Sequence, residues 1–184
     1  VQAGWETPDQ FWHMCFSDLP NTYRDAALGD GLRAFLGGGA TAPAPGQPAL
    51  SALVMTGLAS LVPDGTILER MRGYVVLWTV LIAVLVALTA ALTAVTVRFA
   101  PRRAAGVALS PIVALVALVS PDPLGVALVA VALFAWSRGA AYATGLFLGL
   151  AIVARTYPLV LVVALFLLCA RAGRLRVFGK IGLT

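Results

Sequence analysis

Two ionisable side chains stand in long apolar runs, where a charge is costly and marks a functional candidate, and a third lies among aromatic and apolar residues near the start of the chain. Asp18 lies in Phe-Ser-Asp-Leu-Pro, Asp122 in Ser-Pro-Asp-Pro, and Arg155 in Ala-Arg-Thr-Tyr-Pro. A carboxylate held among apolar groups has a raised pKa and is a stronger general base. An arginine can hold a phosphate through two parallel charge-assisted hydrogen bonds. These residue types predict a site that deprotonates a hydroxyl and binds a phosphate.

Each of these residues also has a purely structural interpretation. Asp18 suits a turn or a helix cap, and Asp122 suits the N-cap of a helix that follows it. Arg155 can reach ordinary phospholipid headgroups by extending along the helix. The sequence leaves both interpretations open for the two aspartates. For Arg155 it favours function, because Tyr157 and Pro158 stiffen the turn and add a hydroxyl.

The composition assigns these residues to a membrane protein. Of the 184 residues, 60% are hydrophobic and only 11% are charged, whereas soluble domains carry about 25% charged residues. This composition excludes a soluble enzyme, a disordered tail and a nucleic-acid-binding module. The net charge of +5 comes largely from short basic clusters beside apolar runs, and such clusters orient membrane helices. We therefore expect membrane lipids around the chain and no nucleic-acid partner.

The residues that bind metals or form disulfides are few. Cys15 and Cys169 are the two cysteines, and His13 is the single histidine. Two cysteines give no disulfide framework, and one histidine gives no zinc-type ligand set. We expect neither a metal nor a cofactor.

The apolar runs predict an all-α polytopic membrane protein with an external segment over residues 1–73 and a helix bundle over residues 74–184. The external segment mixes acids with aromatic residues, as at a lipid–water boundary, and its apolar run 49–62 is too short to cross. We expect interfacial helices there. About five spanning helices are expected, at 74–97, 104–120, 123–137, 140–154 and 157–171. Within the bundle, Gly145-x-x-x-Gly149 predicts a close helix contact.

Two of the long runs are broken by a turn that contains proline. Residues 104–137 hold a single charge, Asp122, and residues 139–170 hold a single charge, Arg155. Proline removes a backbone donor and disfavours helix before it, so we interpret each run as two short helices joined by a turn. A second interpretation keeps each run as one broken helix, as in transporters, and puts both charges near the bilayer midplane.

Basic residues help to choose between these topologies, because they concentrate on the cytoplasmic side. With the arginines after residue 97 inside, the hairpins put Asp122 and Arg155 outside the plasma membrane. Arg138 and the basic segment 171–180 then lie inside. Eight of the thirteen basic residues become cytoplasmic and all eight acids external. The broken-helix topology puts Arg138 outside, so the charge pattern mildly favours the hairpins.

Three motifs follow one another along the chain. They are Ser-Asp-Leu-Pro-x-x-Tyr, Ser-Pro-Asp-Pro-Leu-Gly-Val-Ala-Leu and Gly-Leu-Phe-Leu-Gly-Leu-Ala-Ile-Val-Ala-Arg-Thr-Tyr-Pro-Leu. Their order resembles the actinobacterial polyprenyl-phosphate-mannose-dependent mannosyltransferases of glycosyltransferase family 87. The resemblance covers most of residues 15–172 and is most specific over residues 120–158. It implies the GT-C membrane fold, with a first helix and a C-terminal half that lie outside this chain.

The resemblance implies roles for single residues. Asp18 matches the first-loop aspartate that acts as the catalytic base. Arg155 and Tyr157 match a cation-x-Tyr-Pro turn that often carries lysine. The substrate-binding residues that the resemblance and their neighbourhood imply are Asp122, Arg155, Tyr157, Tyr23 and Arg24. The chain departs from the family in having Ser-Pro before Asp122, where a pair that contains asparagine is common.

The resemblance implies an inverting glycosyltransferase. Such an enzyme moves a sugar, with mannose as the first candidate, from a polyprenyl-phosphate donor to a cell-envelope glycolipid or polysaccharide outside the cell. A carboxylate takes the acceptor's proton and a cation stabilises the departing phosphate. Two alternatives stay open. One is a transporter or flippase of a lipid-linked substrate, whose broken helices act as gates, and the other is an inactive membrane scaffold.

Overall fold

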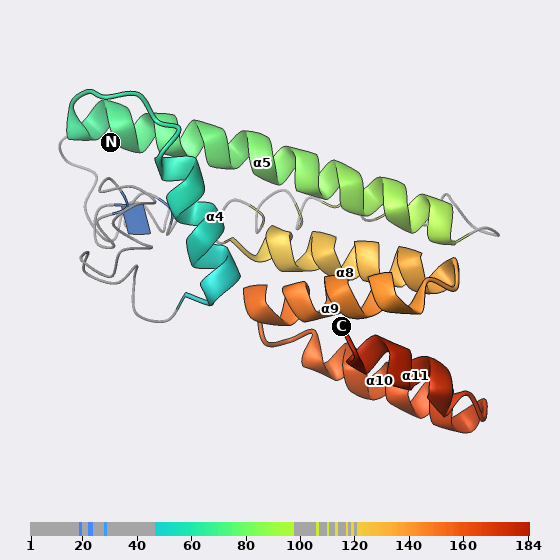
Figure 1. The fold of residues 1–184 in the computed structure, drawn as a ribbon. Helices are drawn as coiled ribbons and strands as arrows, with labels where there is room; N and C mark the ends of the chain where they lie inside the picture. The colour runs from blue at the N-terminus through green and yellow to red at the C-terminus, as the bar shows by residue number, and fades with distance from the viewer. Residues whose placement is uncertain are drawn as a thin grey trace, which may run out of the picture.

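The computed structural model describes residues 47–97 and 121–184, together with Leu19, Thr22, Tyr23, Leu28, Gly106, Ser110, Val113, Ala117 and Val119. Within these residues every long element is a helix (Figure 1), which confirms the predicted all-α class. The helices are α4 (Ala49–Ala59), α5 (Ile67–Thr96), α8 (Asp122–Ser137), α9 (Ala141–Ala154), α10 (Leu159–Arg171) and α11 (Leu175–Gly182). Most of the expected helix 104–120 lies outside the described residues.

Within the described ranges, α5 is the one helix that is long and apolar enough to cross a membrane. Its 30 residues rise about 45 Å, against about 30 Å for a bilayer's hydrocarbon core. One side is buried and carries Tyr74, Trp78, Ile82 and Leu85. The other side is exposed and carries Val76, Val80, Val84 and Leu88. A continuous exposed apolar stripe is unfavourable in water, which supports a lipid environment for this side.

A capping box starts α5 before the expected span, which began at Tyr74. The backbone N–H of Glu69 donates to the Thr66 hydroxyl at 3.4 Å, and the Thr66 N–H donates to the Glu69 carboxylate at 2.9 Å. This reciprocal pair satisfies two backbone donors of the first turn. The first turns of α5 therefore contain charged residues. An expectation based on an uncharged run leaves these turns out and starts the helix at Tyr74.

The helices α8, α9 and α10 are short and run in alternating directions (Figure 1). The turn between α8 and α9 includes Gly139, whose φ of 77° lies in the left-handed region that favours glycine. The turn between α9 and α10 ends at Pro158, the N-cap of α10. The three helices rise about 24, 21 and 20 Å, which is less than the thickness of a hydrocarbon core.

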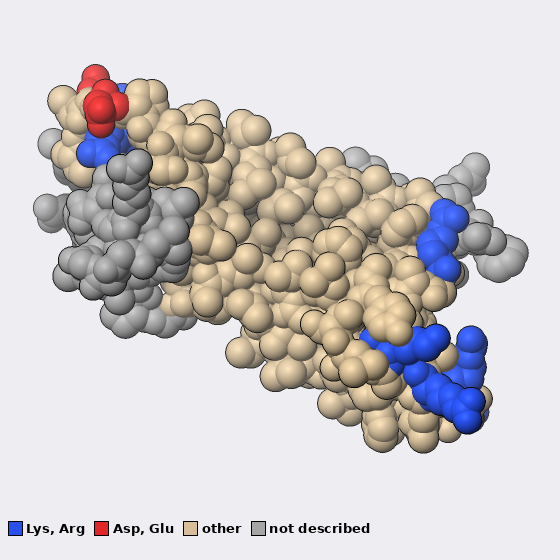
Figure 2. All heavy atoms as spheres, in the orientation of Figure 1, with Lys and Arg blue, Asp and Glu red and all other residues tan. Residues whose placement is uncertain are grey.

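Because these helices alternate in direction, the charged residues of the bundle lie at its two ends. α8 begins at Asp122, and α9 ends directly before Arg155, so these residues share one end. Arg138 follows α8, and Arg171 is the last residue of α10, so these two share the opposite end. Figure 2 shows basic side chains gathered at that opposite end. The second broken run is thus a pair of oppositely directed helices, as the hairpin interpretation expects.

A buried cluster joins the head of the chain to α4 and α5. Tyr23 is 2% exposed, and its ring centroid lies 4.9 Å from that of Tyr74. The members of the cluster are Leu19, Tyr23, Leu28, Met55, Ala59, Val62, Tyr74, Trp78, Ile82 and Ala117. We call this set the head cluster. It fixes Leu19, Tyr23 and Leu28 against the first half of α5.

Helix α11 turns back and packs against α9 (Figure 1). A Cβ atom placed at Gly145 would collide with the backbone oxygen of Ile181 and with the Thr184 hydroxyl. At Gly149 the same atom would meet nothing within 4 Å. The close contact that the Gly145-x-x-x-Gly149 pattern predicts is therefore found at its first glycine, with α11 as the neighbour.

These two glycines give a matched test of this contact. We expect Gly145→Ala to destabilise the chain by about 1–3 kcal/mol, because the added methyl group overpacks against backbone atoms. Gly149→Ala should leave stability unchanged or raise it by up to about 1 kcal/mol, because alanine is the better helix former. Thermal unfolding of the two variants in detergent measures the difference. Equal melting temperatures would contradict the observed packing of α11.

Candidate functional site

Asp122 and Arg155 lie in contact. The Nε atom of Arg155 is 2.5 Å from Oδ1 of Asp122, and the side chains of Arg155 and Asp122 are 22% and 49% exposed respectively. The two atoms are close enough for an ion pair, but the N–H group at Nε is not aligned for a hydrogen bond. Two charges that stand alone in separate apolar runs are therefore brought together by the fold.

Helix ends position both members of the pair. Asp122 is the first residue of α8, and a negative charge is stabilised at a helix N-terminus. Arg155 is the C-cap of α9, with φ −158° and ψ 150°, and a positive charge is stabilised at a helix C-terminus. The N-cap of α8 is Pro121, with no side-chain cap hydrogen bond. Pro121, and not Asp122, therefore occupies the N-cap position of α8.

Tyr157 adds a hydroxyl to the site and lies against Gly125 of α8, a glycine that the sequence patterns above do not mark. A Cβ atom at Gly125 would lie 2.9 Å from the Tyr157 hydroxyl and 3.4 Å from Cγ of Arg155. Only glycine leaves room for this approach. Its signal in the sequence is its spacing, because it follows Asp122 by three positions and so lies one turn along the helix.

The Tyr157 hydroxyl is electrostatically linked to the ion pair. Burial raises its pKa, the Asp122 charge raises that pKa further, and the Arg155 charge lowers it. The ring remains 45% exposed. The hydroxyl is therefore held in its neutral form, in which it can donate a hydrogen bond.

Helix α4 supports the site from a distant part of the sequence. The Ser51 hydroxyl, which is fully buried, donates to the backbone oxygen of Ala154 at 2.9 Å. The last carbonyl groups of a helix have no partner within the helix, so Ser51 satisfies one of them directly before Arg155. The sequence analysis missed Ser51, because its partner lies 103 residues away.

The same helix connects the site to the head cluster. Met55 follows Ser51 by one turn of α4 and belongs to the head cluster together with Leu19 and Tyr23. Four residues of helix rise about 6 Å. The head cluster and the turn after α9 are thus held close to each other by one turn of α4.

The remaining predicted site residues are placed differently. Tyr23 packs on Tyr74 in the head cluster, and its buried hydroxyl has no hydrogen-bond partner among the described residues. It does not join the Asp122–Arg155 pair. Asp18 and Arg24 lie outside the described residues, so their roles stay predictions.

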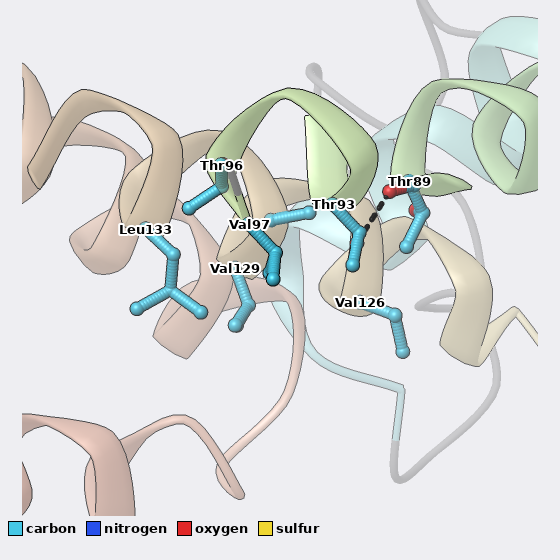
Figure 3. Close-up of a pocket in the computed structure, with 8 residues that line it drawn as sticks. Thr89, Thr93, Thr96, Val97, Val126, Val129 and Leu133 are labelled. Carbon is cyan, nitrogen blue, oxygen red and sulfur yellow. Dashed lines mark hydrogen bonds between the residues drawn. The ribbon is translucent and has the colours of Figure 1, made fainter. Parts of the chain in front are cut away.

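An apolar groove runs between α5 and α8 (Figure 3), with a cavity of about 270 Å³. Its lining residues are Thr89, Thr93, Thr96, Val97, Val126, Val129, Ala130 and Leu133. The three threonine hydroxyls donate to carbonyl oxygens of their own helix, at 2.7–2.8 Å, so the lining presents little free polarity. Val126, Val129 and Leu133 follow Asp122 at spacings that share one face of α8. The groove therefore begins one turn from the ion pair.

Comparison of the chain with protein-family models, with curated proteins and with solved structures found no match. Within the residues that the structure describes, no three His, Cys, Asp or Glu side chains gather to hold a metal ion. What the described geometry offers is a cation held by a carboxylate, a neutral hydroxyl and an adjoining apolar groove.

The linkage between Tyr157 and the pair predicts a titration. We expect the Tyr157 phenol to ionise above the ordinary tyrosine pKa of about 10, because burial and the Asp122 charge both favour its neutral form. The ultraviolet absorbance difference between the wild type and Tyr157→Phe, followed with pH, measures the midpoint.

Two variants check the causes of this shift. Asp122→Asn should move the midpoint down, and Arg155→Gln should move it up, because each removes one of the neighbouring charges. The stability that the neutral phenol contributes is present below the ordinary pKa and is lost as pH rises through the raised one. A wild-type midpoint at or below that of free tyrosine would contradict the observed environment.

Proposed function

We propose that the Asp122–Arg155 pair binds the phosphate of a lipid-linked sugar and that the chain is part of a membrane glycosyltransferase. The observation that carries this proposal is the placement of Arg155. It caps the C-terminus of α9 and is held by Asp122, which lies one turn of α8 before Val126 of the apolar groove. A cation beside an apolar groove suits a phosphate that is attached to a long hydrocarbon chain.

The guanidinium of Arg155 has donors for such a phosphate. Its contact with Asp122 is made at Nε, and the terminal nitrogens of an arginine carry further N–H groups in a planar fork. A carboxylate that fixes the guanidinium prepares it in advance for a charge that develops during reaction. Asp122 is then a positioning residue, and Tyr157 adds a neutral donor beside it.

In the proposed reaction, the acceptor's hydroxyl attacks the anomeric carbon of the sugar. A carboxylate takes the proton of that hydroxyl, the new carbon–oxygen bond forms, and the bond from the anomeric carbon to the phosphate oxygen breaks. The electron pair leaves with the polyprenyl phosphate, whose charge Arg155 stabilises. Asp18 is the proposed base by the resemblance to family 87. Attack opposite to the leaving phosphate gives inversion.

The described contacts support a shared site for the head of the chain and the last hairpin. One turn of α4 links the head cluster to the end of α9, and Asp18 directly precedes Leu19 of that cluster in the sequence. We place this end outside the plasma membrane, in a multi-pass protein of GT-C type. The acceptor is then a cell-envelope glycolipid or glycan.

A transporter with broken helices would hold its charges midway along its spans. Here Asp122 and Arg155 lie at helix ends, on the end opposite to Arg138 and Arg171. This position favours a site at the membrane surface, where a lipid phosphate is found.

A transfer assay tests the proposed function. Membranes that contain the full chain are given polyprenyl-phosphate mannose with a radiolabelled sugar, and transfer to endogenous glycolipid or glycan is measured. We expect Asp18→Asn to lower the rate by about 10²–10⁴-fold, the usual contribution of a general base. Asp64→Asn, which changes an exposed aspartate of the external segment, should leave the rate unchanged.

The same assay separates donor binding from base catalysis. Arg155→Gln should raise the donor KM and lower kcat/KM, while the acceptor KM stays unchanged, because Arg155 is assigned to the phosphate. Wild-type membranes that transfer no more sugar than membranes without the chain would contradict the proposal.

A further inference from the structure

The end of the molecule opposite to Asp122 carries a group of exposed cations. We call it the basic end; its members are Arg138, Arg171, Arg174, Arg176 and Lys180. No acidic residue follows Asp122 in the sequence. The other described acids, Asp64 and Glu69, lie at the start of α5, and Figure 2 shows acidic side chains far from the basic end. Within the described residues these cations therefore have no acid to neutralise them.

Helix α11 holds its part of the basic end in a fixed orientation. Phe178 of α11 stacks edge to face on Phe166 of α10, with ring centroids 5.3 Å apart. Ile181 of α11 packs toward α9 and is only 6% exposed. Arg176 and Lys180 are one turn apart and lie on the opposite face of the helix from Phe178 and Ile181. The anchored apolar face thus directs the two cations outward.

Apolar side chains flank these cations on the surface. Leu168 is 58% exposed at the end of α10, and Leu175 is 53% exposed at the start of α11. Arg176 and Lys180 repel each other at this spacing on a helix, so an anion between them is favoured. A free anion would leave the flanking leucines in water. A partner with both an anionic headgroup and hydrocarbon chains satisfies the cations and the leucines together.

We infer that the basic end is a binding site for anionic phospholipids. The headgroup phosphate lies on the cations of α11 and of the turn before it, and the acyl chains lie along the exposed face of α10. This site is separate from the Asp122–Arg155 pair and lies at the opposite end of the bundle. It holds α11 at the surface of the leaflet that is richer in anionic lipid.

Lipid titration of the purified full chain tests this inference. Phosphatidylglycerol and phosphatidylcholine of the same chain length are added in detergent, and bound lipid is counted by native mass spectrometry. We expect the wild type to bind phosphatidylglycerol at least tenfold more tightly. Arg176→Gln/Lys180→Gln should weaken that binding about 25-fold, because each cation near an anionic headgroup contributes about fivefold in affinity. Arg70→Gln/Arg72→Gln removes two cations from the other end and should keep the wild-type preference.

Two further measurements keep the test decisive. Raising the salt concentration should weaken phosphatidylglycerol binding to the wild type and leave phosphatidylcholine binding unchanged, which needs no variant. Equal affinity for both lipids, or a preference that survives Arg176→Gln/Lys180→Gln, would overturn the inference. Complete competition by inorganic phosphate would also overturn it, because the site would then take a free anion rather than a lipid.

Discussion

The ion pair between Asp122 and Arg155 is the contact on which the candidate site depends. It joins the N-terminus of α8 to the C-terminus of α9, where both charges are stabilised by the helix dipoles. Gly125 leaves the space that the pair and Tyr157 need, and Ser51 satisfies a carbonyl directly before Arg155. The pair is thus fixed by two helices and supported by a third, which makes its geometry a property of the fold.

The two ends of the bundle differ in charge and in shape. One end holds a cation paired with a carboxylate, next to the head cluster and the start of an apolar groove. The other end holds cations that no described acid neutralises, on a helix that folds back onto the bundle. Between them, α5 presents an exposed apolar stripe. A lipid bilayer is the environment that matches this order, with the proposed lipid-phosphate site at one surface and the proposed anionic-lipid site at the other.

The sequence predicts the parts of this molecule that depend on local rules. Apolar runs give the helices, prolines give the turns, and the rarity of charge singles out Asp122 and Arg155. Contacts between distant segments escape such rules. The bond from Ser51 to Ala154 spans 103 residues, and the need for glycine at position 125 follows only from the approach of Tyr157. The packing of α11 on Gly145 also depends on a turn whose direction no local pattern gives.

Binding of polyprenyl monophosphate to the purified full chain tests whether the Asp122–Arg155 pair holds the phosphate of a lipid. Native mass spectrometry of the wild type, Arg155→Gln and Arg138→Gln compares the site with a cation at the opposite end. We expect Arg155→Gln to bind this lipid at least tenfold more weakly, and Arg138→Gln to bind it as the wild type does. Equal binding by the wild type and Arg155→Gln would contradict the assignment of the phosphate to the Asp122–Arg155 pair.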